Sequence, residues 1–379
     1  MRRLCVFVAL LVLAGPVLAR AQGQALTSAE PFKLGTFEIE GEEVIGIVLR
    51  DEIVVELGAA NRALERDPIY PAVPMPEDMV ELIGRYEYGL KARLYEIVND
   101  LVAQRRLDGA GRARFVHRVA DVRTRPPLMP GKIMNAAVNF YSHVGEQGTP
   151  EQQRQAAEER RKTRGVPYLF LKPTRGAIVG NGDAVVLPYG RDQIDWEVEL
   201  GIVIGRAAKY VPAPRAADHI FGYMVTIDIS DRGGRPPDSR PGSDWFVGKG
   251  HDTFAPMGPW IVPKEFYGDP MERLRQVLMV DGKVMQEAGA ADMIHSIYEL
   301  LEYASSLITL FPGDVLNNGT SGGTGMGTAY RGEQQFLKAG DTIEASIDGI
   351  GTLTLPVVAE EGRPEGTGSF LPPVSSYRR

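Results

Sequence analysis

The sequence predicts an α+β fold that is mainly β, and three observations point to it. Of the 379 residues, 43 are glycine and 27 are proline, which favours many turns and short strands over a helical bundle. An apolar share of 44% and a charged share of 24% exclude disordered, collagen-like and polytopic membrane proteins. Strand-like runs such as AVVLP and TIEASI recur between Gly and Pro turns. We therefore expect a small N-terminal domain over residues 22–128 and a larger domain over residues 129–360.

Residues 1–21 are predicted to be a secretory signal peptide, cut after Ala21. Arg2 and Arg3 precede a short apolar run, and small residues flank the cleavage position. The run is too short to span a bilayer, so we expect a secreted or periplasmic protein with no membrane span after cleavage; an uncleaved anchor is the alternative. Cleavage removes three arginines, no acids and the only cysteine, which takes the net charge from −7 to −10 and leaves no thiol. Without a basic stripe, nucleic acid is not an expected partner.

Local patterns place the remaining elements in order. Residues 33–60 carry short apolar runs between Gly and Asp turns, which predicts strands. Residues 76–106 repeat apolar side chains at helical spacing, and the three prolines of residues 123–132 predict a linker. Further strands and one helix over residues 291–310 follow. The polar, Pro- and Gly-rich tail over residues 361–379 is expected to be ordered only in part.

Four acids in two neighbouring strand-like segments suggest a cation site. If residues 192–205 form a strand, Asp195, Glu197 and Glu199 lie on one face, which either is solvated or holds a hard cation. A second apolar run contains Asp228, and a buried carboxylate needs a partner or a metal. An all-oxygen set suits Mg²⁺, Mn²⁺ or Ca²⁺, and zinc is disfavoured because no Cys or His cluster accompanies the acids.

Three other segments carry groups that could do chemistry. His143 and Glu146 share a face if they lie on one helical turn, either as a surface pair or as a base that takes a proton from water. Lys249 lies between two glycines, where a backbone can approach a ligand, although an ordinary solvated loop lysine fits too. Thr320 lies in a Gly-rich turn, either a plain turn or one whose N–H groups converge on an anion.

Six segments of the chain together resemble the fumarylacetoacetate hydrolase family, in that family's order. The resemblance covers residues 132–358 and extends weakly to the N-terminal β segment. The motifs are NFYSHVGE (139–146), YLFLKP (168–173), DWEVELGIVIG (195–205), TIDISDR (226–232), GKGHDTFAPMGPW (248–260) and FPGDVLNNGTSGG (311–323).

The resemblance implies a mixed β-roll or barrel-like catalytic domain, a homodimer and a set of site residues. It implies Mg²⁺ or Mn²⁺ held by Glu197, Glu199 and Asp228. It implies that His143, oriented by Glu146, is the general base that activates water. The other roles it implies are stabilisation of an enolate or oxyanion by Lys249, and substrate binding by Thr320, Lys172, Arg232 and Gly319.

The activity implied by the resemblance is hydrolysis of a C–C bond in a β-diketo acid or an acylpyruvate-type 2-oxo acid. The same metal site could serve a 2-oxo acid decarboxylase or an isomerase or hydratase, because one fold supports several reactions. A secreted protein that only binds a 2-oxo acid is a third reading. A protein that had lost catalysis would not be expected to keep every catalytic and metal-binding group. This chain keeps His143, Glu146, Lys249 and all three carboxylates.

Some positions depart from the family pattern. Gly233 replaces a second aspartate after Asp228. His251 and His295 take positions that resemble family phenylalanines, and we interpret both as packing substitutions.

Two segments beside the predicted site suggest contacts with substrate. Residues 147–166 are polar and helix-prone, and form either a lid over the site or a solvated helix. Arg235 and Arg240 lie in a loop beside the site. Either could clamp a distal carboxylate, although a loop arginine that only keeps the surface soluble is commoner.

Overall fold

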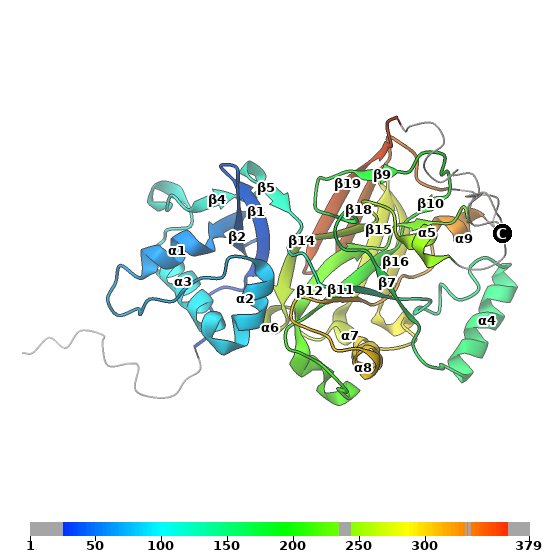
Figure 1. Cartoon of the computed structure of the whole chain (residues 1–379), viewed down its shortest axis with the longest axis horizontal. Coiled ribbons are helices and arrows are strands. Elements are labelled where there is room, and N and C mark those ends of the chain that lie inside the picture. The colour runs from blue at the N-terminus through cyan, green and yellow to red at the C-terminus, as the bar shows by residue number, and fades with distance from the viewer. Residues whose placement is uncertain (1–25, 235–243, 330–331, 333–334, 363–379) are drawn as a thin grey trace, which may run out of the picture.

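The computed structural model describes residues 26–234, 244–329, 332 and 335–362 (Figure 1). It contains more strand than helix, which confirms the predicted class. The predicted signal peptide, nearly all of the polar tail and the loop that holds Arg235 and Arg240 lie outside the described residues. Among the described helices, none is long and apolar enough to cross a membrane.

A twelve-stranded sheet runs through the whole molecule and carries the acidic segments near its centre. Ten strands form a continuous path, while β5 (Arg123–Arg125) pairs with β1 and β8 (Ile178–Val179) pairs with β14. In order, the path is β4 (Val116–Arg118), β3 (Ile53–Glu56), β2 (Glu42–Leu49), β1 (Lys33–Ile39), β14 (Ala255–Pro263), β12 (Ile220–Ile227), β11 (Val198–Ile204), β17 (Val315–Asn317), β6 (Ile133–Ala136) and β7 (Leu169–Lys172).

A five-stranded sheet packs against strands β11, β12 and β14 of the first sheet (Figure 1). Its alternating pattern turns Ile343, Ala345 and Ile347 into the main core. A separate two-stranded ladder pairs β10 (Ile194–Asp195) with β13 (Ser230–Asp231). The order of the second sheet is β16 (Lys283–Gly289), β15 (Arg275–Val280), β18 (Thr342–Ile347), β19 (Gly351–Ala359) and β9 (Val185–Leu187).

Strand β11 is buried along its whole length, and this decides where its acids point. Val198, Leu200 and Ile202 belong to the main core. Because side chains alternate along a strand, Glu199 points to the opposite face, which is also covered. A glutamate of this sheet is therefore held inside the protein rather than on a solvated edge.

Helices cover the N-terminal end of the large sheet, and one of them is interrupted. The predicted helix over residues 76–106 is divided into α2 (Met79–Arg85), a π-helical turn (Tyr86–Leu90) and α3 (Lys91–Ala103). The interruption falls at Gly89, whose φ of 119° lies outside the helical range. The predicted strand region over residues 33–60 ends at β3, and α1 (Leu57–Leu64) follows directly.

The N-terminal region shares its sheet and its core with the rest of the chain. Strand β1 pairs with β14 through Leu34 and Ile261, and both side chains are fully buried. The proline-rich segment 123–132, predicted as a linker, contributes strand β5 to this junction. The two regions are thus joined by hydrogen-bonded strands and not only by a connecting segment.

The remaining α-helices lie around the part of the fold formed by residues from 129 onward (Figure 1). The helix-prone segment 147–166 contains α4, which begins with a capping box formed by Thr149 and Gln152. The predicted helix over residues 291–310 contains α8. The α-helices are α4 (Pro150–Lys162), α5 (Trp245–Lys249), α6 (Lys264–Tyr267), α7 (Pro270–Arg273), α8 (Ile297–Leu307) and α9 (Gly325–Ala329), and the 3₁₀ turns are Gly109–Gly111, Val119–Asp121, Ala213–His219 and Ala290–Asp292.

The shared sheet predicts that both regions unfold together. Leu34→Ala should destabilise the protein by about 3 kcal/mol, because it leaves a cavity at a fully buried junction. Differential scanning calorimetry should show one transition at a lower temperature. Leu171→Ala is the matched control, because Leu171 is 59% exposed, and it should leave the transition in place. An N-terminal region that melts first, as a separate transition, would contradict a shared core.

Candidate active site

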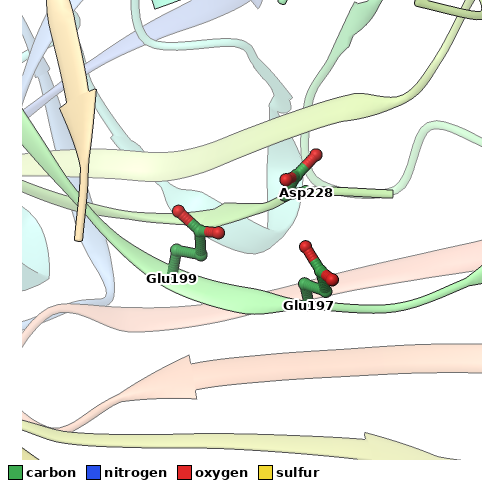
Figure 2. A group of neighbouring side chains, drawn as sticks. All are labelled: Glu197, Glu199 and Asp228. Atoms are coloured by element: carbon green, nitrogen blue, oxygen red, sulfur yellow. The ribbon is translucent and has the colours of Figure 1, made fainter. Parts of the chain in front are cut away.

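Three buried carboxylates converge where β11 and β12 meet (Figure 2). Glu197 directly precedes β11, Glu199 lies within it, and Asp228 directly follows the neighbouring strand β12. The antiparallel register brings them together, and the Asp228 N–H donates to the Glu197 carbonyl at 2.8 Å. One carboxylate oxygen of each residue lies within 4.8 Å of the others. The structure thus brings together the three acids that the sequence pattern and the family resemblance single out.

Asp195 does not join this cluster, because the predicted strand over residues 192–205 is broken. Its carboxylate accepts the N–H of Trp196, and the chain leaves the strand there. Gly325 N and Met326 N also donate to this carboxylate, at 2.6 and 3.1 Å. Asp195 therefore acts as an acceptor for another segment of the chain.

Lys249 contacts two members of the cluster. It ends helix α5 and is buried. Its Nζ donates to Glu197 Oε2 at 2.8 Å, to Asp228 Oδ2 at 2.5 Å and to Ser230 Oγ at 2.6 Å. Burial disfavours the charged amine, but Asp228 and Glu197 outweigh it and raise the pKa of Lys249, so the residue is an ammonium. Lys249 is therefore not the solvated loop lysine that the sequence also allowed. It is a buried cation with three hydrogen-bond acceptors.

Two more cations hold the outer oxygens of the cluster. Lys172 Nζ contacts the other oxygen of Asp228 and lies buried behind it. Arg232 contacts Glu197 Oε1, and its Nε donates to Asp195 at 3.0 Å. Both residues therefore contact carboxylates, and their role in substrate binding stays a prediction of the family resemblance.

Glu199 is the member of the cluster whose charge is least compensated. Its pKa is raised well above the ordinary value by burial and by the charges of Asp228 and Glu197. Burial also opposes ionisation of Glu197, but Lys249 and Arg232 outweigh it and lower the pKa of that carboxyl. Among the described residues, no lysine or arginine lies within 4 Å of Glu199. The cluster is thus an incompletely neutralised pocket of negative charge.

This donor set fits a hard divalent cation. Three converging carboxylates with no sulfur and no imidazole are the chemistry that Mg²⁺, Mn²⁺ and Ca²⁺ prefer. A cation would also compensate the repulsion that raises the pKa of Glu199. Gly319 N and Asn135 Nδ2 orient Glu199 through its Oε2, at 3.1 and 3.4 Å. Asn135 was not predicted, although an amide inside the apolar strand segment IMNA is a signal that sequence reasoning can use.

His143 and Glu146 form a direct pair beside the cluster. His143 Nδ1 lies 2.7 Å from Glu146 Oε2. The pair lies on a series of tight turns rather than on a helix, since the N–H of His143 bonds to Phe140 and that of Glu146 bonds back to His143. Glu146 is buried and His143 is partly exposed. The carboxylate fixes the ring orientation and leaves Nε2 as the second ring nitrogen.

The Gly-rich segment after Thr320 donates its N–H groups to two of the protein's own carboxylates. Gly323 N and Thr324 N donate to Glu146 Oε1, and the Thr324 hydroxyl donates to Glu146 Oε2 at 3.0 Å. The next two N–H groups, of Gly325 and Met326, are the donors to Asp195. One short segment therefore holds both the partner of His143 and a carboxylate that contacts Arg232.

Thr320 has its hydroxyl engaged within the protein. It donates to the Val198 carbonyl at 3.1 Å and accepts from Gln286 Nε2 at 2.8 Å. The family resemblance implies that Thr320 holds a substrate carboxylate. In the structure its hydroxyl ties the turn to β11, and the residue also lines the cavity described next, so its role in substrate binding stays a prediction.

A cavity of about 290 Å³ is lined by six of the predicted site residues, His143, Glu146, Glu197, Arg232, Lys249 and Thr320. Glu199, Asp228, Lys172 and Gly319 do not line it. Apolar side chains such as Phe170, Trp245, Val138 and Met326 also contribute to its lining, and the rings of Phe170 and Trp245 stack at 4.5 Å. A larger cavity, about 380 Å³, lies at the junction with the N-terminal region and contains none of the predicted site residues.

The two unusual histidines lie outside this cavity. His251 Nε2 lies 3.2 Å from Asp231, which also pairs with Arg191. The backbone of His295 bonds with the Asn139 side chain, and burial followed by the charge of Arg164 lowers the pKa of its ring. Neither residue contributes to the walls of the cavity. Their positions agree with a packing role.

Comparisons with known proteins place the chain in a family. Residues 132–358 match the family model described as fumarylacetoacetate (FAA) hydrolase C-terminal. An uncharacterized protein of Pyrococcus abyssi is 41% identical over 234 residues, which covers 62% of this chain and 93% of the relative.

Two solved structures resemble the chain over most of its length. A maleylpyruvate hydrolase from Sphingobium sp. SYK-6, in complex with manganese(II) ion and pyruvate, is 27% identical with a TM-score of 0.62, and the match covers 87% of this chain and 100% of that one. A 5-carboxymethyl-2-hydroxymuconate delta-isomerase from Mycobacterium smegmatis is 28% identical with a TM-score of 0.59, over 87% and 100%. The chain belongs to the fumarylacetoacetate hydrolase family.

Proposed function

We propose that the protein is a metal-dependent hydrolase that cleaves a C–C bond in a β-diketo acid or an acylpyruvate-type 2-oxo acid. The observation that carries the proposal is the shared cavity, which unites the His143–Glu146 pair with Glu197 of the carboxylate cluster. A structural neighbour that is a hydrolase binds manganese(II) and pyruvate, which is itself a 2-oxo acid. Both features agree with a substrate that carries a 2-oxo-carboxylate group.

The carboxylate cluster would hold the cation. A divalent cation bound by Glu197, Glu199 and Asp228 would act as a Lewis acid on the 2-oxo-carboxylate of the substrate. Lys172 and Lys249 fix both oxygens of Asp228. The cluster is thus held rigidly before any ligand arrives.

His143 supplies the base. Its Nδ1 is engaged by Glu146, so Nε2 is the nitrogen that can accept a proton from water. The activated water would attack the carbonyl distal to the carboxylate, and the C–C bond would break with its electron pair passing to the departing 2-oxo fragment. Lys249 and Arg232 place fixed positive charge in the lining of the same cavity, where they stabilise the negative charge that develops.

An isomerase is the second candidate, and it is supported by solved neighbours that are isomerases, such as the delta-isomerase from Mycobacterium smegmatis. A base and a polarised 2-oxo acid suffice to move a proton along the substrate without hydrolysis. The two reactions differ in their products, because only the hydrolase releases two fragments. A decarboxylase would release CO₂ instead. Secretion and a homodimeric assembly remain predictions of the sequence and the family resemblance.

The cluster predicts opposite effects of Glu199→Gln on stability and on metal binding. The pKa of Glu199 is higher in the folded chain than its ordinary 4.5, so its ionisation destabilises the metal-free protein as pH rises above that value. Glu199→Gln should therefore raise the melting temperature in EDTA at pH 7 by about 2 °C, with a smaller gain near pH 4.5. The variant should lose the stabilisation that Mn²⁺ gives to the wild type.

Thermal unfolding with and without Mn²⁺ measures both effects, and manganese electron paramagnetic resonance measures binding. Glu302→Gln, an exposed residue on α8, is the matched control and should change neither. Undiminished Mn²⁺ affinity in Glu199→Gln would remove the cation from this site.

The proposed base predicts a separation of turnover from metal binding. His143→Ala should lower kcat for acetylpyruvate cleavage by roughly 10²- to 10⁴-fold, because no group remains to take the proton from water. Mn²⁺ affinity should not change, since His143 is not part of the carboxylate cluster. A coupled assay of pyruvate release gives kcat, and His219→Ala, at a half-buried histidine that does not line the cavity, is the control. Full activity in His143→Ala would contradict the assignment.

A further inference from the structure

Thr324 donates two hydrogen bonds to Glu146, the partner of the proposed base. It is fully buried. Its N–H donates to Glu146 Oε1 at 3.0 Å, and its hydroxyl donates to Glu146 Oε2 at 3.0 Å. The same hydroxyl oxygen accepts the N–H of Gly327 at 3.1 Å. Because that bond uses the oxygen as an acceptor, and a carboxylate accepts only, the hydroxyl hydrogen is directed at Glu146.

The carboxylate of Glu146 therefore has two donors on each oxygen. Gly323 N and Thr324 N serve Oε1, while His143 Nδ1 and the Thr324 hydroxyl serve Oε2. The surroundings are close-packed, because a Cβ added at Gly327 would lie 2.1 Å from Glu146 Oε1. The rotation of the carboxylate is thus determined from both sides. Thr324 is the one side chain besides His143 that donates to it among the described residues.

We propose that Thr324 is a positioning residue that sets the orientation of Glu146 and, through it, of the His143 ring. The inference rests on the proposed function, in which His143 is the base. Without the hydroxyl, Oε2 would keep only His143 as a donor, and the carboxylate would be held by backbone donors on the Oε1 side alone. The ring would then lose the fixed direction of Nδ1, and Nε2 would spend less time aimed at water in the cavity.

The same segment gives this orientation a wider connection. Directly after Thr324, Gly325 N and Met326 N hold Asp195, which accepts from Arg232. Arg232 in turn contacts Glu197 of the cluster. Thr324 therefore lies directly beside the two residues whose N–H groups hold Asp195. The hydrogen bonds that orient His143 and those that orient Glu197 thus start from one short segment.

Thr324→Val tests the role, because it removes the hydroxyl and keeps the shape. We expect kcat for acetylpyruvate with Mn²⁺ to fall about tenfold, as for loss of a hydrogen bond to a charged group, with KM and Mn²⁺ affinity unchanged. Thr324→Ser should restore most of the turnover. Thr328→Val is the matched control, because Thr328 lies in helix α9, which begins directly after Thr324, and its hydroxyl donates to the Gly325 carbonyl instead of a carboxylate. Thr328→Val should leave kcat unchanged.

A second readout does not depend on turnover. In protein labelled with ¹⁵N-histidine, the Nδ1–H signal of His143 is assigned by its loss in His143→Gln among the five histidines of the chain. Thr324→Val should shift or broaden this signal, while Thr324→Ser and Thr328→Val should preserve it.

The two readouts separate the possible failures. If the wild type cleaves none of the offered substrates, the proposed function is wrong. The Nδ1–H signal of His143 would still decide whether Thr324 positions the ring. A Thr324→Val protein with wild-type kcat and an unchanged signal would overturn the positioning role.

Discussion

The mutual repulsion of three buried carboxylates is the constraint on which the rest of the site depends. Glu197, Glu199 and Asp228 lie within 4.8 Å of one another in a region closed to solvent. Two lysines and an arginine compensate part of this charge, and Glu199 is left with a strongly raised pKa. A divalent cation would complete the compensation, so the features that make the cluster costly in the metal-free chain also favour metal binding.

The fold supplies this constraint through a strand that is covered on both faces. Val198, Leu200 and Ile202 of β11 fill the core between the two sheets, so Glu199 points to the opposite face, which is also buried, and Glu197 directly precedes the strand. The Gly-rich segment that follows β17 then closes the site from the other side. Its N–H groups donate to Glu146 and Asp195. These hydrogen bonds hold the carboxylates that contact His143 and Arg232, two side chains that line the cavity. Rigid positioning of charge before the reaction is what such catalysis requires.

Sequence patterns were sufficient where the chemistry is local. The two-residue period placed Glu197 and Glu199 on one face, and the acid inside an apolar run singled out Asp228. They were insufficient where a side chain competes with the backbone, as at Asp195, which ends its strand by accepting the N–H of Trp196. They were also insufficient for contacts between distant segments. Thr324 and Glu146 are 178 residues apart, and no local pattern predicts that the Gly-rich turn donates hydrogen bonds to a carboxylate of the protein itself.

The most direct test of the account is a product analysis of residues 22–379 with Mn²⁺ or Mg²⁺, with and without EDTA. An acylpyruvate, fumarylpyruvate and oxaloacetate would be offered separately, and all products would be identified. The account predicts metal-dependent release of pyruvate together with one carboxylic acid from at least one of the first two substrates. Rearranged substrate without fragments, or CO₂ and pyruvate from oxaloacetate alone, would contradict a C–C hydrolase and assign the same cavity to an isomerase or a decarboxylase.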